Sequence, residues 1–315
     1  MCRTRPAGGA CRRRGVRAAR AIGATLVCMR REGRGRRTGR ARAAAAAALA
    51  AAAALLVAAP VARAGKSPWA RAVKPSRGPS RAIGGYSAGC VAGAVELPLR
   101  GPGFRVMRPE RRRHFGHRVL VAFIRSLARA ARREKLGPVA LGDLSQPRGG
   151  PAPSGHASHQ TGLDADIWYA FVERKKRVRQ VGMVDHKRAR PTRAWGRRQR
   201  RLLQLAASDP RVERIFVHPV LKKSLCESAR GDRAWLRKIR PWWGHDEHFH
   251  VRMACPEGDA HCRPQSPIPD GDGCAELDSW LSPEAAARRK EKRRAYQSRV
   301  GAVPELPTPC RAIEP

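Results

Sequence analysis

The chain has 315 residues and a formal net charge of +40, with 65 Lys and Arg against 25 Asp and Glu. Its length allows one large domain or two small ones. Such a basic chain would suit a polyanionic partner: nucleic acid, acidic lipid or an anionic wall polymer. However, 54 of the basic residues are Arg. GC-rich coding alone can produce that bias, so the charge does not identify the partner.

The first 64 residues have the organisation of a secretory signal peptide. An apolar run over 43–59 follows an arginine-rich stretch and precedes Ala62-Arg63-Ala64, a small-residue cleavage site. The run is shorter than the roughly 20 residues of a membrane-spanning helix. We therefore predict export to the periplasm, cleavage after Ala64 and no stable membrane span afterwards, which argues against a nucleic-acid partner. Because the basic region is unusually long, Met29 is a candidate for the true start.

After residue 64, the apolar pattern predicts short helices and strands in mixed order. Apolar residues at helical spacing, with arginines between them, predict an amphipathic helix over 117–133. The other expected elements, in chain order, are a strand over 139–141, a loop over 149–162, a strand over 165–171, a helix over 202–207, a strand over 214–217, a short helix over 234–239, a strand over 248–253 and a helix-favouring stretch over 283–296. The absence of regular βαβ alternation favours an α+β fold with a small antiparallel sheet, flanking helices and long loops.

This pattern predicts one globular domain over 65–281, followed by a charged and then Pro-rich tail over 282–315. Residues 173–200 form a basic, polar insertion with little periodicity, which predicts a solvated surface loop. The sequence assigns this insertion no role.

Cysteines indicate how the exported part is stabilised. An even number of cysteines in an exported chain predicts up to three disulfides. A Cys₄ zinc site is the alternative, but the chain contains no C-x₂-C pair. The six cysteines after residue 64 are Cys90, Cys226, Cys255, Cys262, Cys274 and Cys310.

Polar and apolar residues alternate strictly over 248–253. On a strand, His248, His250 and Arg252 share one face, while Phe249, Val251 and Met253 face the core. A lone His-x-His is usually an ordinary surface or core pair, because histidine serves many roles. Here the pair follows an aromatic turn, an arrangement that suits a metal ligand beside a general base.

A second polar cluster, over 156–166, supplies further candidate ligands. His156 and His159 lie in a glycine-flanked loop, and Asp164 and Asp166 follow at a spacing that puts both on one face of a strand. Spacing alone does not choose between the two aspartates. Two imidazoles and one carboxylate around a divalent ion leave a tetrahedral position for water, as in a catalytic zinc site. We therefore expect a metal site on the polar face of the sheet.

Other hydrolase and metal-binding motifs fit less well. His245 and His248 are three residues apart, so the H-E-x-x-H pattern of a zincin helix is absent. The chain has no G-x-S-x-G nucleophile turn. Asp270-Gly-Asp-Gly has the start of a calcium loop but lacks the glutamate at the twelfth position.

Two longer stretches carry a family resemblance: GHASHQTGLDADIW over 155–168 and RKIRPWWGHDEHFHVRMACP over 237–256. Both closely resemble the penicillin-insensitive murein endopeptidases, and the likeness covers roughly 67–281. The resemblance implies a zinc peptidase fold shared with lysostaphin-type and D-Ala-D-Ala peptidases. It also implies one zinc ion, with His159, Asp166 and His250 as ligands and His248 as the base.

The same resemblance concerns three further positions. His156 and His245 match family histidines that line the site. The resemblance therefore implies His156 as a fourth candidate ligand and His245 as a second candidate catalytic residue. Some members hold a second metal with an Asp-x-x-His pair. This chain has Asp185-His186 instead, which weakens the case for a second metal.

The function implied by the resemblance is hydrolysis of D-alanyl–meso-diaminopimelyl cross-links in peptidoglycan. A D-Ala-D-Ala carboxypeptidase of the same fold and a non-catalytic wall-binding module are the alternatives. By position against the family, the expected disulfides are Cys90–Cys310, Cys226–Cys274 and Cys255–Cys262.

Overall fold

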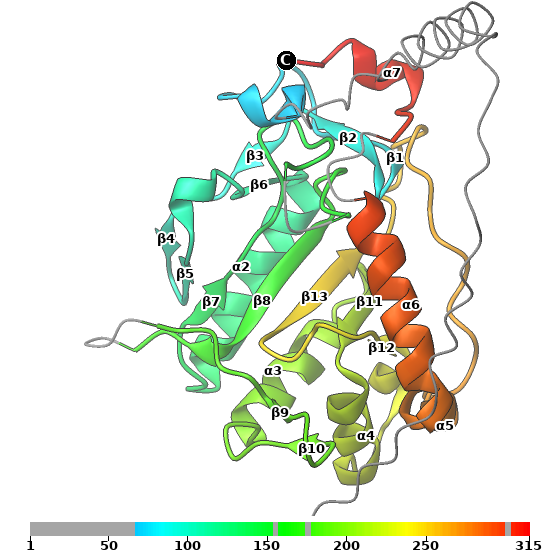
Figure 1. The fold of residues 1–315 in the computed structure, drawn as a ribbon. Helices are drawn as coiled ribbons and strands as arrows, with labels where there is room; N and C mark the ends of the chain where they lie inside the picture. Colours follow the sequence, from blue (N-terminus) through cyan, green and yellow to red (C-terminus); the bar gives the residue numbers. More distant parts are fainter. Residues whose placement is uncertain (1–66, 154–156, 174–177, 300–303) are drawn as a thin grey trace, which may run out of the picture. The chain divides into compact units, whose positions relative to one another are not determined.

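The computed structural model describes residues 67–153, 157–173, 178–299 and 304–315 (Figure 1). The predicted signal peptide over 1–64, including Met29, lies outside these ranges, and so does His156. Within the described ranges, no helix combines the length and the apolar character needed to cross a membrane.

A seven-stranded sheet forms the centre of the fold. Its order is β12 (Ile239–Pro241), β11 (Val212–Val217), β13 (His248–Met253), β8 (Asp164–Phe171), β7 (Val139–Leu141), β5 (Phe104–Val106) and β4 (Arg100–Gly101). The α+β class is confirmed. The prediction of an antiparallel sheet is wrong at two places, because β5 pairs with β7 and β11 pairs with β12 in parallel. In both cases a helical segment connects the two strands, and such a crossover permits parallel pairing.

Three two-stranded sheets surround the main sheet. They are the hairpin β1 (Arg81–Gly85) with β2 (Ala88–Ala92), the pair β3 (Val95–Glu96) with β6 (Phe115–Gly116), and the pair β9 (Val184–Asp185) with β10 (Arg190–Pro191). The last pair corrects the prediction of a solvated loop over 173–200. Met183, Val184 and Trp195 from this segment are buried in the core, because their apolar side chains can be removed from water there.

The helix α2 (Arg118–Arg133) confirms the amphipathic pattern. Its seven buried side chains enter the core, and the His117 side chain accepts a hydrogen bond from the Val119 N–H at its start. The predicted helix over 202–207 is the second half of α3 (Arg197–Ala207). The predicted helix over 234–239 is a 3₁₀ turn, Ala234–Lys238, that leads directly into β12. The remaining helices are α4 (Pro219–Ser228), α5 (Leu277–Leu281), α6 (Pro283–Arg299) and α7 (Thr308–Arg311), with 3₁₀ turns at Pro68–Arg71 and Pro109–Arg111.

The two faces of β13 are as predicted. Phe249, Val251 and Met253 are fully buried and share one core with the buried residues of α2 and α3. The alternate residues of the strand therefore point to the opposite face of the sheet. Polar side chains gather on that face.

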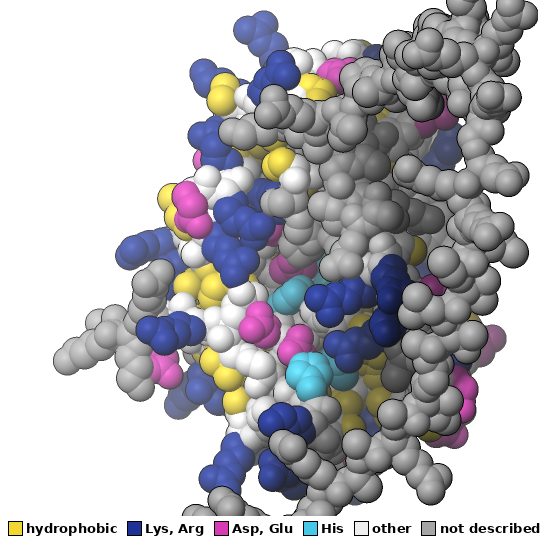
Figure 2. Space-filling model, viewed as in Figure 1, with side chains coloured by type: hydrophobic (Ala, Val, Ile, Leu, Met, Phe, Trp, Pro, Cys, Tyr) yellow, Lys and Arg dark blue, Asp and Glu magenta, His cyan; other side chains and the backbone are white. Residues whose placement is uncertain are grey.

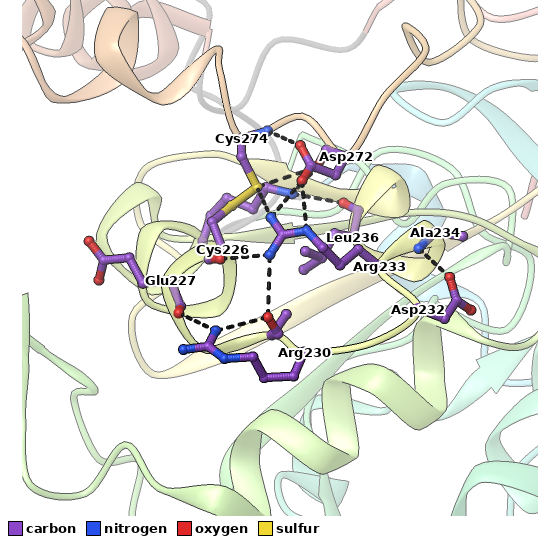
Figure 3. Close-up of polar contacts among 11 residues, drawn as sticks. Cys226, Glu227, Arg230, Asp232, Arg233, Ala234, Leu236, Asp272 and Cys274 are labelled. Carbon is purple, nitrogen blue, oxygen red and sulfur yellow. Dashed lines mark hydrogen bonds and ion pairs between the residues drawn. A yellow bond between two sulfur atoms is a disulfide. The ribbon is translucent and has the colours of Figure 1, made fainter.

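All three expected disulfides are present: Cys90–Cys310, Cys226–Cys274 and Cys255–Cys262. Figure 3 shows Arg233 beside the second of these. Its guanidinium donates to Asp272 at 2.6 and 3.1 Å and to the Cys226 carbonyl at 2.9 Å. These bonds fix the loop that precedes α5.

Candidate metal centre

The pairing of β13 with β8 assembles the polar face. His250 lies opposite Asp166, and Arg252 lies opposite Asp164. Directly opposed residues in an antiparallel pair have side chains on the same face, with Cβ atoms about 5 Å apart. This register therefore brings two aspartates, a histidine and an arginine together, although the two strands are far apart in the sequence.

His159, Asp166 and His250 converge on one point of this face. The Asp166 Oδ1 atom lies 3.4 Å from His159 Nε2 and 3.2 Å from His250 Nδ1. All three side chains are buried, and one ligand atom from each lies within 4.8 Å of the others. Of the described residues, these three make up the single group of three or more His, Cys, Asp or Glu that could hold a metal ion.

His159 occupies its position with an unusual backbone. Its φ of 67° lies in the left-handed region, which non-glycine residues adopt rarely and at a cost in free energy. The His159 N–H donates to Asp164 Oδ2 at 3.0 Å, and this bond stabilises the turn. The unfavourable backbone conformation thus occurs at the residue whose side chain belongs to the cluster, His159.

Asp164 forms hydrogen bonds with two of these residues, His159 and His250. Its Oδ1 atom lies 2.9 Å from His250 Nε2 and accepts from Arg252 Nε at 2.7 Å. Burial alone would raise the pKa of Asp164, but Arg252 and His250 outweigh burial and hold that pKa well below its ordinary value. Asp164 is therefore a fully buried carboxylate that orients His250.

This arrangement separates the two aspartates, between which the spacing alone did not choose and of which the resemblance implied Asp166 as the ligand. Asp166 faces the cluster, whereas Asp164 binds the outer nitrogen of His250. The positioning role of Asp164 and Arg252 was missed from the sequence. The sequence pattern that corresponds to this role is the Asp-x-Asp of β8 opposite the His-x-Arg of β13. The pattern indicates the role only when the register between the two strands is known.

The donor set fits zinc. Two imidazole nitrogens and one carboxylate oxygen are ligands that catalytic zinc takes, with a fourth position left for water. His250 donates from Nε2 to the ionised Asp164, so Nδ1, which lies 3.2 Å from Asp166 Oδ1, is the nitrogen that would coordinate the ion. A carboxylate behind a ligating histidine is the usual way in which proteins fix this tautomer.

Two more histidines lie beside the cluster. His248 Nε2 is 3.6 Å from Asp166 Oδ1, and the His245 ring centroid lies 5.2 Å from that of His248 and 5.9 Å from that of His250. The His245 Nδ1 atom faces the carbonyls of Trp242 and Trp243 at 3.3 and 3.2 Å. Since carbonyls only accept hydrogen bonds, Nδ1 carries the proton and Nε2 has a free lone pair.

Burial and the neighbouring imidazoles of His248 and His250 hold the pKa of His245 well below its ordinary value, so this ring is neutral. Figure 2 shows histidine and acidic side chains in the middle of the viewed face, with Lys and Arg around them. One neutral histidine, His245, thus lies beside the cluster, and basic side chains surround this part of the face.

Asp185 and His186 form hydrogen bonds and ion pairs with different residues. Asp185 accepts from the backbone N–H of Lys187 and of Arg188 and pairs with the Arg188 side chain at 3.1 Å, while His186 Nε2 lies 3.0 Å from Asp246 Oδ2. Among the described residues, Asp185 and His186 do not converge with a third candidate ligand.

The chain is similar in sequence to one family of known proteins. A family model described as penicillin-insensitive murein endopeptidase matches residues 82–314. A relative with that name from Yersinia enterocolitica is 42% identical over 264 residues, which cover 81% of this chain and 92% of the relative. A relative of the same name from Klebsiella pneumoniae is 41% identical over 256 residues, covering 78% of this chain and 90% of its own length. A third, from Salmonella paratyphi C, is 40% identical with the same coverage.

The match includes the sheet, the candidate ligands and all three disulfides. It also continues through the C-terminal tail that carries Cys310. The likeness of two short motifs thus extends over residues 82–314, and the chain belongs to the penicillin-insensitive murein endopeptidase family.

Proposed function

We propose that the protein is a zinc-dependent murein DD-endopeptidase that hydrolyses D-alanyl–meso-diaminopimelyl cross-links of peptidoglycan in the periplasm. The observation that carries the proposal is the convergence of His159, Asp166 and His250 within 4.8 Å, in a chain of this family. The relatives are named as murein endopeptidases, and this supports murein as the substrate.

His159, Asp166 and His250 are the residues that would hold the zinc ion, and Asp164 orients the His250 ring through its hydrogen bond with Nε2. When bound, zinc polarises the scissile carbonyl and lowers the pKa of its water toward about 7. The proposed set also includes His156, which precedes His159 by three residues in the sequence and lies outside the described residues.

His248 is the proposed general base. It takes the proton from the attacking water and returns it to the leaving amine, a role typically worth about 10²–10⁴-fold in rate. His245 supports this step, since its neutral ring lies against that of His248. The reaction has no serine acyl-enzyme, so β-lactams that acylate a serine do not block it.

Digestion of purified wall fragments tests the proposal. We expect cross-linked dimers to fall to monomers with the wild-type chain and to persist with Asp166→Asn. Release of free D-alanine would instead identify a carboxypeptidase. Binding of wall fragments without either product would identify a non-catalytic module.

A further inference from the structure

A second candidate site lies between the start of α3 and the C-terminal end of α4. A groove there has a volume of about 520 Å³. Its lining includes four arginines, one acid and one tryptophan: Arg197, Arg200, Arg201, Arg230, Glu134 and Trp235. The first two arginines come from the basic segment 173–200, to which the sequence assigned no role.

The positive charge of this groove is largely uncompensated. Glu134 is the one acid in its lining, and Arg201 engages it fully, with Nε and Nη2 each 2.7 Å from a carboxylate oxygen. In the part of the chain that the structure describes, no carboxylate lies within ion-pair distance of Arg197, Arg200 or Arg230. Three guanidinium groups therefore face one concave surface without a counter-charge.

The groove is also partly pre-organised. Arg197 and Arg200 lie in the first two turns of α3, where no acid is present and the positive end of the helix dipole adds to their charge. Arg230 Nη1 donates to the carbonyls of Glu227 and Ala229 at 2.8 and 3.0 Å (Figure 3). A side chain held in this way loses less conformational entropy when it binds a ligand.

The groove is separate from the metal centre. The buried side of α3, including Leu202 and Leu203, packs in the same core as Phe249 and Val251 of β13. Since side chains alternate along a strand, His248 and His250 lie on the other face of that sheet. The sheet thus stands between the groove and the histidines.

We propose that this groove binds a phosphate-bearing anion. Guanidinium groups match phosphate oxygens in charge and in bidentate geometry. The volume exceeds that of a bare ion and has room for a group attached to the phosphate, against which Trp235 offers an aromatic side chain. A free phosphate compound and an anionic lipid headgroup present the same chemistry, so the test has an arm for each.

The test compares two full-length double variants with the same change in charge. Arg197→Glu with Arg200→Glu alters the groove. Arg125→Glu with Arg129→Glu alters exposed positions on α2 outside it. Glutamate is favourable in the first turn of a helix, so the groove variant should fold. Thermal melting and wall-fragment digestion, both unchanged, would confirm folding.

One arm titrates pyrophosphate by calorimetry at physiological salt. The other measures flotation with vesicles of phosphatidylglycerol, against vesicles of phosphatidylcholine alone. We expect affinity in at least one arm to fall by about tenfold or more in the groove variant, and to change little in the α2 variant. Loss in the vesicle arm alone identifies the lipid headgroup as the source. Equal loss in both variants, or no binding in either arm, would overturn the proposal.

Discussion

Replacing Asp164 with Asn tests how the metal centre is held together. Three residues donate to this carboxylate: His159 through its N–H at 3.0 Å, His250 through Nε2 at 2.9 Å, and Arg252 through Nε at 2.7 Å and Nη2 at 3.4 Å. Asn has almost the same shape but carries no charge and one acceptor oxygen fewer. The variant therefore keeps every proposed ligand while it loosens two of them and leaves Arg252 without its buried counter-charge.

Two effects should follow. Loss of a carboxylate behind a metal-binding histidine typically lowers metal affinity by about 10–100-fold, which corresponds to roughly 1.4–2.7 kcal/mol. Separately, breaking a buried ion pair costs about 3–5 kcal/mol of folding stability. We expect Asp164→Asn to unfold at a lower temperature and to bind zinc more weakly, but still at one ion per chain.

Competition with a chelator would measure the zinc affinity, with circular dichroism to show that the variant is folded at the assay temperature. Asp166→Asn is the matched control, because it removes a proposed ligand directly and should lose more affinity. Wild-type affinity in Asp164→Asn, or equal losses in the two variants, would refute the division of roles between these aspartates.

Three other outcomes are expected. Elemental analysis should find about one zinc per wild-type chain and almost none with His159→Ala; full retention would remove His159 from the ligand set. His248→Ala should keep zinc and lose about 10²–10⁴-fold in turnover, whereas zinc lost here but kept in His250→Ala would reverse the two roles. Burial lowers the pKa of Lys222 from 10.5 to about 8, so between these values the unfolded chain binds more protons and stability rises with pH. In urea unfolding, the wild type should gain about 1.3 kcal/mol over Lys222→Met between pH 7 and pH 9; a constant difference would contradict this pKa.

Patterns contained within one element were readable from the sequence. The alternation over 248–253 gave the faces of β13, and the helical spacing over 117–133 gave α2 to within one residue. The segment after β11 was missed, although Pro219 and the capping His218 mark the start of α4. Its short apolar run can be either a buried strand or a helix, and periodicity does not separate the two.

Features that depend on contacts between distant parts of the chain could not be predicted from local sequence patterns. The choice between Asp164 and Asp166 follows from the register of β8 against β13, which no local pattern contains. The parallel pairs β5–β7 and β11–β12 depend on where helical crossovers return the chain. The basic insertion was assigned to solvent because its buried apolar residues, Met183, Val184 and Trp195, form no periodic pattern and become neighbours of the core only in the folded chain.

The register between β8 and β13, which places their polar side chains opposite one another, also determines where this protein tolerates insertions and deletions. Removing one residue from either strand would shift the pairing by one position and turn Asp164, Asp166, His250 and Arg252 away from one another together. The connection between the strands contains α3, β11, α4 and β12, and β11 pairs with β13, so only its exposed loops are free of this constraint. Loop closure becomes only slowly more costly as a loop lengthens. Variants that lengthen or shorten the exposed loops joining α3, β11, α4 and β12 can therefore keep the metal centre, whereas a single-residue deletion in β8 or β13 cannot.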